Sequence, residues 1–192
     1  MPSPDCEPLD SAARASLLAL ARGSIAHGLG HGRALAVDPG DFEGRLRAPG
    51  AAFVTLHEED RLRGCIGRLE PVQPLVRDVA ENAFAAAFRD PRFPPLQRDE
   101  LGQIRISVSV LTPAEPLACP DEEALLASLV PGVDGVILEA GKARGTFLPA
   151  VWEDLPDPRD FLRHLKRKAG LPPQYWSDQL QAWRYRTESF GE

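Results

Sequence analysis

Apolar residues recur along the chain at spacings of three and four, which is typical of helices that bury one face. Residues 11–27 show this spacing, and Asp10 or Ser11 can cap the helix that they predict. The glycines that follow at 28, 30 and 32 predict its end. Further helices are predicted at residues 74–89, 121–129 and 158–169.

Alternation of apolar and polar residues predicts the strands. Two hairpins are predicted, formed by residues 51–57 with 61–69 and by residues 133–139 with 144–151. Single strands are predicted at residues 104–110 and 183–188. The order helix, hairpin, helix, strand therefore occurs twice, which indicates an α+β fold with an internal duplication and halves at residues 10–111 and 121–190.

The duplication has a consequence for a ligand site. Residues 61–64 (RLRG) align with residues 142–145 (KARG). If the two hairpins join into one curved sheet, Arg63 and Arg144 take equivalent positions, and a cleft between the halves is the expected ligand site.

Composition and charge narrow the class of protein. The chain has 192 residues, 43% hydrophobic and 26% charged, which is ordinary for one globular domain over residues 1–192. The net charge of −6 argues against a main role in binding nucleic-acid phosphates. Residues 1–8 predict a loose tail without the basic and apolar regions of a signal peptide, and no apolar run approaches the roughly 18 residues of a membrane span. We therefore expect a cytoplasmic protein.

The cysteines and motifs predict neither a disulfide framework nor a bound group. Cys6, Cys65 and Cys119 form no CxxC motif and cannot all pair, which indicates a reducing compartment. No spacing of His, Cys and Asp predicts a metal, and no phosphate loop or dinucleotide motif is present. Neither a metal nor a cofactor is expected.

Residues 62–67 (LRGCIG) place a cysteine between two glycines in a predicted strand. Gly64 and Gly67 indicate a bulge, a bend or the close approach of a ligand or another segment. Arg63 would favour the thiolate that a reactive Cys65 needs. A lone cysteine in an intracellular strand is more often a small buried hydrophobic side chain than a nucleophile, and both roles of Cys65 remain open.

The hairpin offers no histidine partner for Cys65. With a two-residue turn, His57 lies opposite Leu62. Cys65 then lies opposite Val54, on the same face as Arg63. In this register His57 points to the other face. A register slipped by one residue would place His57 on the Cys65 face, but across from Arg61 and roughly 13 Å along the strand from Cys65. No direct His57–Cys65 pair is therefore expected in either register.

Arg63 needs a partner, because an unpaired buried guanidinium is costly. The partner is either an anionic ligand or a carboxylate of the protein. The carboxylate candidates are Glu70, Asp78, Glu81, Asp90 and Glu115.

Two further segments carry charge. Residues 90–95 (DPRFPP) form a predicted rigid loop that presents an acid, Arg92 and an aromatic ring. The loop either contributes to a site or only ends the preceding helix, with Phe93 anchored in the core. Residues 166–168 (KRK) end a predicted helix, where cations complement the helix dipole, and the alternative is a patch for RNA or a partner.

Several segments resemble the AMMECR domain family, and the resemblance extends over nearly the whole chain. Residues 62–67 resemble the hallmark of the family. Other similar stretches are residues 54–56 (VTL), 83–96 (AFAAAFRDPRFPPL), 100–101 (EL), 107–115 (SVSVLTPAE) and 141–170. The second hairpin departs from the family pattern at residues 141–145 and 148–151.

The resemblance implies a duplicated fold around a single barrel-like, mostly antiparallel sheet. Similar prokaryotic proteins are often named AmmeMemoRadiSam system protein A. The name implies that their genes occur together with those of a Memo-like protein and a radical SAM enzyme. The Memo-like protein is related to extradiol dioxygenases. We therefore expect a component of that system, and whether it is an enzyme stays open. The alternatives are a non-catalytic ligand-binding or adaptor module and, disfavoured by the charge, a nucleic-acid-binding protein.

The candidate site combines the residues singled out above. Cys65 is the candidate catalytic residue. The candidate ligand-binding residues are Arg63, Gly64, Gly67, Arg92, Arg144 and Glu115, and the expected ligand is a small anion. A contact with the Memo-like protein or the radical SAM enzyme is expected around Arg63, Cys65 and residues 90–95.

Overall fold

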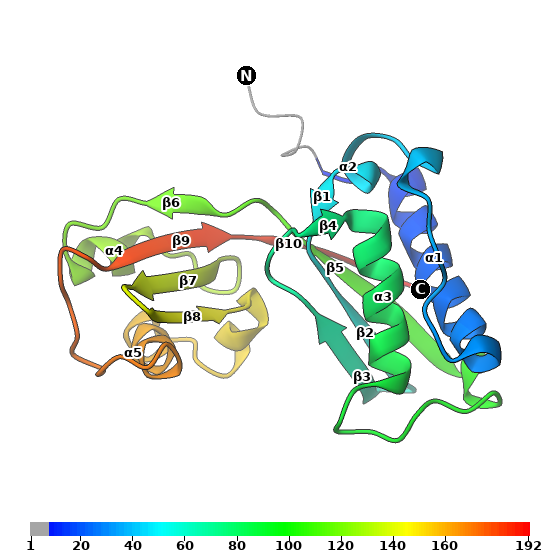
Figure 1. The fold of residues 1–192 in the computed structure, drawn as a ribbon. Helices are drawn as coiled ribbons and strands as arrows, with labels where there is room; N and C mark the ends of the chain where they lie inside the picture. Colours follow the sequence, from blue (N-terminus) through cyan, green and yellow to red (C-terminus); the bar gives the residue numbers. More distant parts are fainter. Residues whose placement is uncertain (1–7) are drawn as a thin grey trace. The chain divides into compact units, whose positions relative to one another are not determined.

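The computed structural model describes residues 8–192, which divide into two compact units (Figure 1). The first unit is Met1–Leu111 with Glu188–Glu192, and the second is Thr112–Thr187. Most of the predicted loose tail, with Cys6, lies outside the described residues. None of the helices within residues 8–192 has the length and apolar character that a membrane span requires.

The first unit is built on a four-stranded sheet with the strand order β10-β5-β2-β3. Strand β2 pairs antiparallel with both β3 and β5. The main elements are α1 (Ser11–His31), β2 (Ala52–Glu58), β3 (Arg61–Gly67), α3 (Leu75–Phe88), β5 (Ile104–Leu111) and β10 (Thr187–Gly191). Shorter elements are η2 (Pro39–Asp41), α2 (Gly44–Arg47), η3 (Glu100–Gly102) and the ribbon of β1 (Pro49–Gly50) with β4 (Gln73–Pro74).

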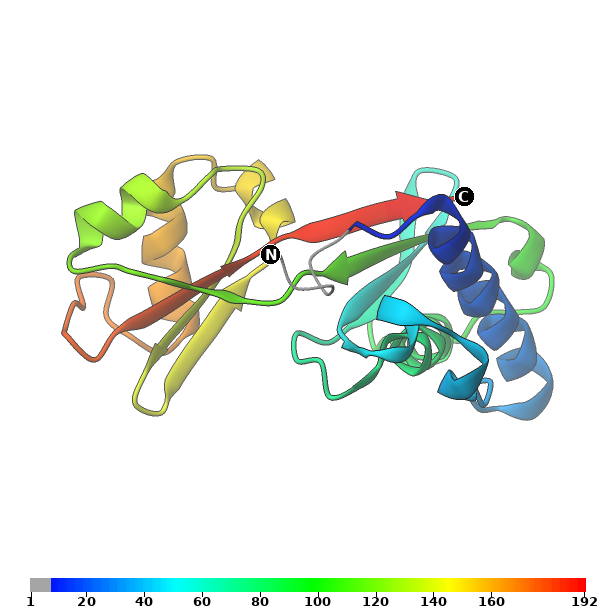
Figure 2. The ribbon, with the colours of Figure 1, turned by 90° about the horizontal axis from the view of Figure 1, so that it is seen from above.

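The helices α1 and α3 contact each other and pack on one face of this sheet (Figures 1 and 2). Alternate strand residues supply the sheet side of the core, because side chains of a strand point to its two faces in turn. Val54 and Leu56 of β2 are fully buried in this core. Thr55 and His57 therefore point to the opposite face of the sheet.

The second unit has its own four-stranded sheet and its own core. Its sheet has the strand order β6-β9-β7-β8, and one core cluster contains residues of α4, α5 and this sheet. The elements are β6 (Glu115–Leu117), α4 (Glu122–Ser128), β7 (Gly135–Ala140), β8 (Ala143–Phe147), η4 (Pro149–Glu153), α5 (Pro158–Lys168) and β9 (Gln181–Tyr185). In the core the ring of Phe161 stacks on that of Trp152, with 3.7 Å between the ring centroids.

The end of α1 differs from the prediction. The helix continues through Gly28 and ends where Gly32 adopts a left-handed backbone with φ of 65°. Gly28 is buried, and a Cβ at this position would overlap the rings of Phe84 and Phe88. The glycine thus serves close packing of α1 on α3 rather than a helix stop, a distinction that the local sequence does not contain.

The expectation of a single barrel-like sheet is wrong. Residues 8–192 form two four-stranded sheets and one two-stranded ribbon, and none of these sheets closes into a barrel. One reason lies at β3, an edge strand of the first sheet. The free side of β3 is occupied at Cys65 by side chains of residues 90–92, so a further strand cannot pair there.

The predicted order helix, hairpin, helix, strand is present in both units. Four strands were not predicted: β6, which pairs with β9, β10, which lies next to β5, and the short strands β1 and β4 of the ribbon. Each hairpin also carries a glycine where a helix comes close: a Cβ at Gly64 would overlap Ala86 of α3, and one at Gly145 would lie 2.8 Å from the Ala169 nitrogen. The order of elements is therefore shared, whereas the duplication itself stays a prediction.

The approach of α3 to β3 leads to a stability prediction. Gly64→Ala should lower the free energy of unfolding by about 3 kcal/mol, because the added methyl group meets the backbone carbonyl of Ala86, which cannot rotate away. Chemical denaturation measures the change. The control is Gly30→Ala in α1, where no atom lies within 4 Å of the added Cβ and stability should stay unchanged or rise by up to about 1 kcal/mol. Equal stability of the Gly64→Ala variant and the wild type would contradict the packing described here.

Candidate functional site

A β-bulge sets the direction of Cys65. The hairpin register shifts between Leu56 and His57, so that Leu56 pairs with Gly64 while His57 pairs with Leu62. Arg63 is the extra residue of the bulge. The pairing of His57 with Leu62 confirms the prediction. The prediction that Cys65 lies opposite Val54 is wrong, because the bulge moves every later residue of β3 by one position and Cys65 pairs with Thr55.

The sulfur of Cys65 therefore lies on the face of the sheet opposite α1 and α3. Thr55 donates a hydrogen bond from Oγ1 to the sulfur at 3.2 Å. Cys65 as a residue is half-buried. His57 shares this face, but it lies two residues along β2 from Thr55, which is roughly 7 Å. A direct His57–Cys65 pair is not formed.

The backbone of Cys65 is held by two side chains from the segment after α3. Asp90 accepts a hydrogen bond from the Cys65 N–H at 2.9 Å, and Arg92 donates one to the Cys65 carbonyl oxygen at 3.1 Å. Arg92 also donates to the Asp90 carboxylate, from Nη2 at 2.7 Å and from Nε at 3.0 Å. We call Asp90 and Arg92 the edge cap, because together they occupy the free side of β3 as a neighbouring strand would.

The edge cap carries a strong charge pair. Asp90 is buried, and hydrogen bonds from Arg92 and from the Cys65 backbone hold the pKa of its carboxyl well below the usual range. The pKa of Arg92 is raised, chiefly by its hydrogen bond to Asp90 and to a smaller extent by Cys65. Its side chain is 54% exposed. The edge cap thus places the guanidinium of Arg92 beside Cys65. Because this guanidinium is exposed, a ligand from solvent can also bind it.

Arg63 has a partner that was not among the five predicted carboxylates. It donates to Glu100 in η3, from Nε to Oε1 at 2.6 Å and from Nη2 to Oε2 at 3.1 Å. Arg63 is buried, and its hydrogen bond lowers the pKa of Glu100. The candidates failed because the local sequence gives no sign that Glu100 folds back onto β3. The geometry gives Arg63 a structural ion pair, and a ligand contact of Arg63 stays a prediction.

Two further hydrogen bonds hold the same segment, one to α3 and one within the segment. The Leu96 N–H donates to the Ala87 carbonyl at 2.8 Å, and the Leu96 side chain is buried in the core. Gln97 donates its N–H to Glu100 at 2.6 Å. Residues 90–100 therefore run along β3 with fixed contacts at both ends.

Known proteins resemble this chain in sequence and in fold. The sequence model of the AMMECR1 family matches residues 18–190. The chain belongs to the AMMECR1 family. It is similar to a protein of Methanothermobacter thermautotrophicus, 42% identical over 156 residues, which cover 80% of this chain and 81% of the relative. A protein of Aeropyrum pernix is 40% identical over 193 residues, covering 97% of this chain and 81% of the relative.

A solved structure shares the fold of this AMMECR1-family protein. The crystal structure of the uncharacterised protein PH0010 from Pyrococcus horikoshii matches with a TM-score of 0.77 at 36% sequence identity. The match covers 92% of this chain and 90% of that chain. The family resemblance inferred from residues 62–67 and the other segments is confirmed.

The predicted site residues of this AMMECR1-family protein fall into three groups. Cys65 and Arg92 lie together at the edge cap. Gly64 and Gly67 lie in the same strand, where Gly64 faces α3 and a Cβ at Gly67 would overlap Phe53 on the opposite face. Both glycines thus have a packing role, and a ligand contact stays a prediction for each.

The third group belongs to the second unit. Arg144 pairs with Glu139 across the hairpin of β7 and β8, with 3.7 Å between Nε and Oε2. Glu115 lies 3.3 Å from Nε of Arg184. Their binding roles also stay predictions. Within residues 8–192, no three His, Cys, Asp or Glu side chains gather as metal ligands would.

Two residues at the site were missed by the sequence reasoning. Thr55 was noted only within a predicted strand and within the VTL match, because its contact with Cys65 depends on the bulge. Glu100 appeared only within the short EL match. The signal that points to Glu100 is the buried Arg63, which needs a carboxylate from somewhere in the chain.

The Arg63–Glu100 pair leads to a prediction with a defined pH dependence. Glu100→Ala leaves a buried guanidinium without its carboxylate and should lower the free energy of unfolding by about 3 kcal/mol at pH 7. Because the pKa of Glu100 is lowered on folding, its contribution is present above the ordinary Glu pKa of about 4.3 and is lost as the pH falls. The difference from the wild type should therefore be constant around neutral pH and should shrink as the pH falls below about 4.3.

The matched control is the double variant Arg63→Met/Glu100→Ala. Removing both charges should cost less than the sum of the two single changes, as denaturation curves can measure. Strict additivity, or a difference that does not vary with pH, would show that the two side chains do not interact as described.

Proposed function

We propose that this AMMECR1-family protein is a thiol-bearing component of a multi-protein system, and that Cys65 with Arg92 forms its reactive or ligand-binding site. The observation that carries the proposal is the pair of contacts at Cys65. Thr55 donates to the sulfur, and Arg92 donates to the carbonyl oxygen of the same residue. A hydroxyl donor and a nearby cation both stabilise negative charge on a sulfur.

The roles differ from those expected from sequence. Arg92 replaces Arg63 as the cation beside the thiol, because Arg63 is buried against Glu100 whereas Arg92 is half exposed. A small anionic ligand would bind the guanidinium of Arg92 and lie near the sulfur of Cys65. Thr55 would orient the sulfur. No second catalytic group is assigned, so the site works either with a reactive ligand or with a partner protein.

The partner part of the proposal rests on the family resemblance. The co-occurrence of genes for similar prokaryotic proteins supports a Memo-like protein and a radical SAM enzyme as partners in the cytoplasm. The loop of residues 90–95 supports a contact surface, because Arg92, Pro94 and Pro95 are exposed while Asp90 and Leu96 hold the loop in place. A rigid exposed segment loses little conformational entropy when a partner binds it.

Alkylation of the intact protein tests the thiol role. Iodoacetamide should label Cys65 at pH 7 at least about tenfold faster than Cys119, by attack of sulfur on carbon and loss of iodide. Cys119 is the internal control, because it is also half-buried and burial raises the pKa of its thiol. Peptide mass spectrometry at several times gives both rates.

Two substitutions identify the cause of the reactivity. Thr55→Val and Arg92→Met should each slow labelling of Cys65 several-fold, whereas Thr55→Ser should restore the wild-type rate. Adding the purified Memo-like protein or the radical SAM enzyme should protect Cys65 from labelling but leave Cys119 unaffected. A Cys65 that labels no faster than Cys119 would refute the reactive site, and protection by a partner would then support the adaptor alternative.

A further inference from the structure

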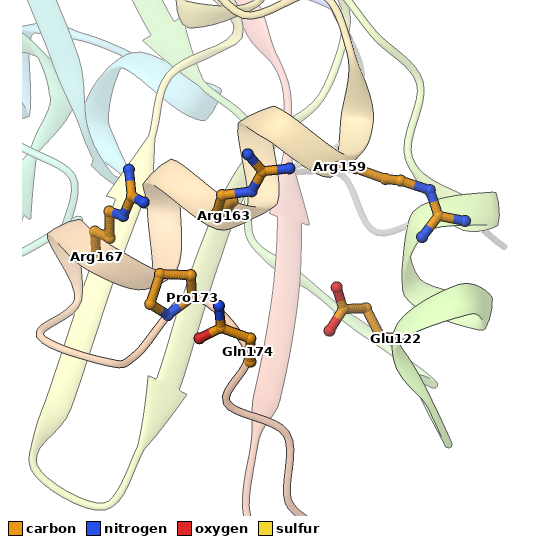
Figure 3. Close-up of a pocket in the computed structure, with 6 residues that line it drawn as sticks. All are labelled: Glu122, Arg159, Arg163, Arg167, Pro173 and Gln174. Atoms are coloured by element: carbon orange, nitrogen blue, oxygen red, sulfur yellow. The ribbon is translucent and has the colours of Figure 1, made fainter.

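We infer that the second unit carries a separate anion site, a groove along α5 that binds a small ligand bearing phosphate groups. Three arginines on α5 line this groove together with Glu122, Pro173 and Gln174, and its volume is about 510 Å³ (Figure 3). This volume lies in the range of pockets for small molecules.

The arginines form one row because of helical spacing. Arg159, Arg163 and Arg167 follow one another at intervals of four residues, so each lies roughly 6 Å further along the same face of α5. The opposite face of the helix, with Phe161 and Leu165, is fully buried in the core of the unit. Packing of α5 therefore fixes the row of arginines toward the groove.

The helix α5 is strongly positive, whereas the whole chain is negative. The helix contains five Lys and Arg residues and one Asp, in a protein with a net charge of −6. The dipole accounts for the cations in its last turn but not for Arg159 in the first turn, where a cation is unfavourable. Arg159 is held there by Glu123 of α4, with two contacts of 2.8 Å.

The carboxylates around the groove do not neutralise it. Glu122, which lines it, is paired with the buried Lys166 at 2.6 Å. Within the described part of the chain, the one carboxylate that pairs with Arg163 is that of the neighbouring Asp160, at 3.1 Å in an exposed pair of the kind that contributes little. Among residues 8–192, Arg167 has no carboxylate partner. The groove therefore keeps an excess of positive charge at Arg163 and Arg167.

The groove suits a ligand that carries linked phosphate groups. The planar guanidinium forms paired hydrogen bonds with phosphate oxygens, and two guanidiniums one turn apart can hold two linked phosphoryl groups. The side-chain amide of Gln174 adds a donor at the same groove. Two features favour a small molecule over a nucleic acid. Pro173 and Gln174 make the groove concave, and the chain as a whole is acidic.

Titration with inorganic pyrophosphate tests the inference on the full-length protein. Isothermal calorimetry in buffers of constant ionic strength should show saturable binding to one site. The double variant Arg163→Ala/Arg167→Ala should bind at least about tenfold more weakly, and Arg167→Lys should lose less, because it keeps the charge but not the paired hydrogen bonds. Thermal melts of each variant confirm that it remains folded.

The control variants separate a built groove from general charge. Arg98→Ala removes an exposed arginine of the first unit and should leave pyrophosphate binding unchanged. Cys65→Ser should also bind normally, because the groove does not involve the thiol. Absence of saturable binding, or equal weakening by Arg98→Ala, would overturn the inference. Tighter binding of a single-stranded RNA 10-mer than of pyrophosphate, lost in the same double variant, would overturn the assignment to a small ligand.

Discussion

The hydrogen bond from the Cys65 N–H to the buried Asp90 carboxylate is the contact on which the candidate site depends. Cys65 lies in an edge strand, where unpaired backbone groups would otherwise recruit another chain or remain unsatisfied. Asp90 and Arg92 satisfy the N–H and the carbonyl of the same residue. The edge cap therefore closes the sheet on this side, and it also brings a guanidinium next to the thiol.

The unusual composition of the motif strand follows from three separate constraints. Gly64 lets α3 approach β3 without a side chain in between. Arg63 is the bulge residue and reaches Glu100, which holds η3 against the strand. Cys65 is turned to the opposite face by the same bulge, where it meets Thr55. Three adjacent residues of one strand thus have different roles: Gly64 allows the helix to pack, Arg63 attaches the loop, and Cys65 provides the thiol.

Much of the local structure could be predicted from the sequence. Alternating apolar residues predicted the strands β2 and β5, and acidic residues predicted where α4 and α5 begin. The register of the first hairpin was predicted only as far as His57 and Leu62, because a bulge depends on packing between α3 and β3 rather than on local preference. The family resemblance was also accessible from residues 62–67.

The candidate site was less predictable because it is made by long-range contacts. Cys65 and Arg92 were singled out from their own segments, but their proximity required the edge cap to fold back across 25 residues from Asp90 to Cys65. The partner of Arg63 was missed for the same reason. The strands β6 and β10 were also missed, since neither β6 (Glu115–Leu117) nor β10 (Thr187–Gly191) has the apolar alternation of a half-buried strand.

Amide hydrogen exchange at Cys65 tests the role of the edge cap most directly. In the wild type the Cys65 N–H should be protected, because its acceptor Asp90 is buried. In Asp90→Ala this amide should exchange about 10- to 100-fold faster, while the amide of the buried Leu56 in β2 keeps its protection and reports an intact sheet. Unchanged protection of the Cys65 amide in a folded Asp90→Ala variant would contradict the account.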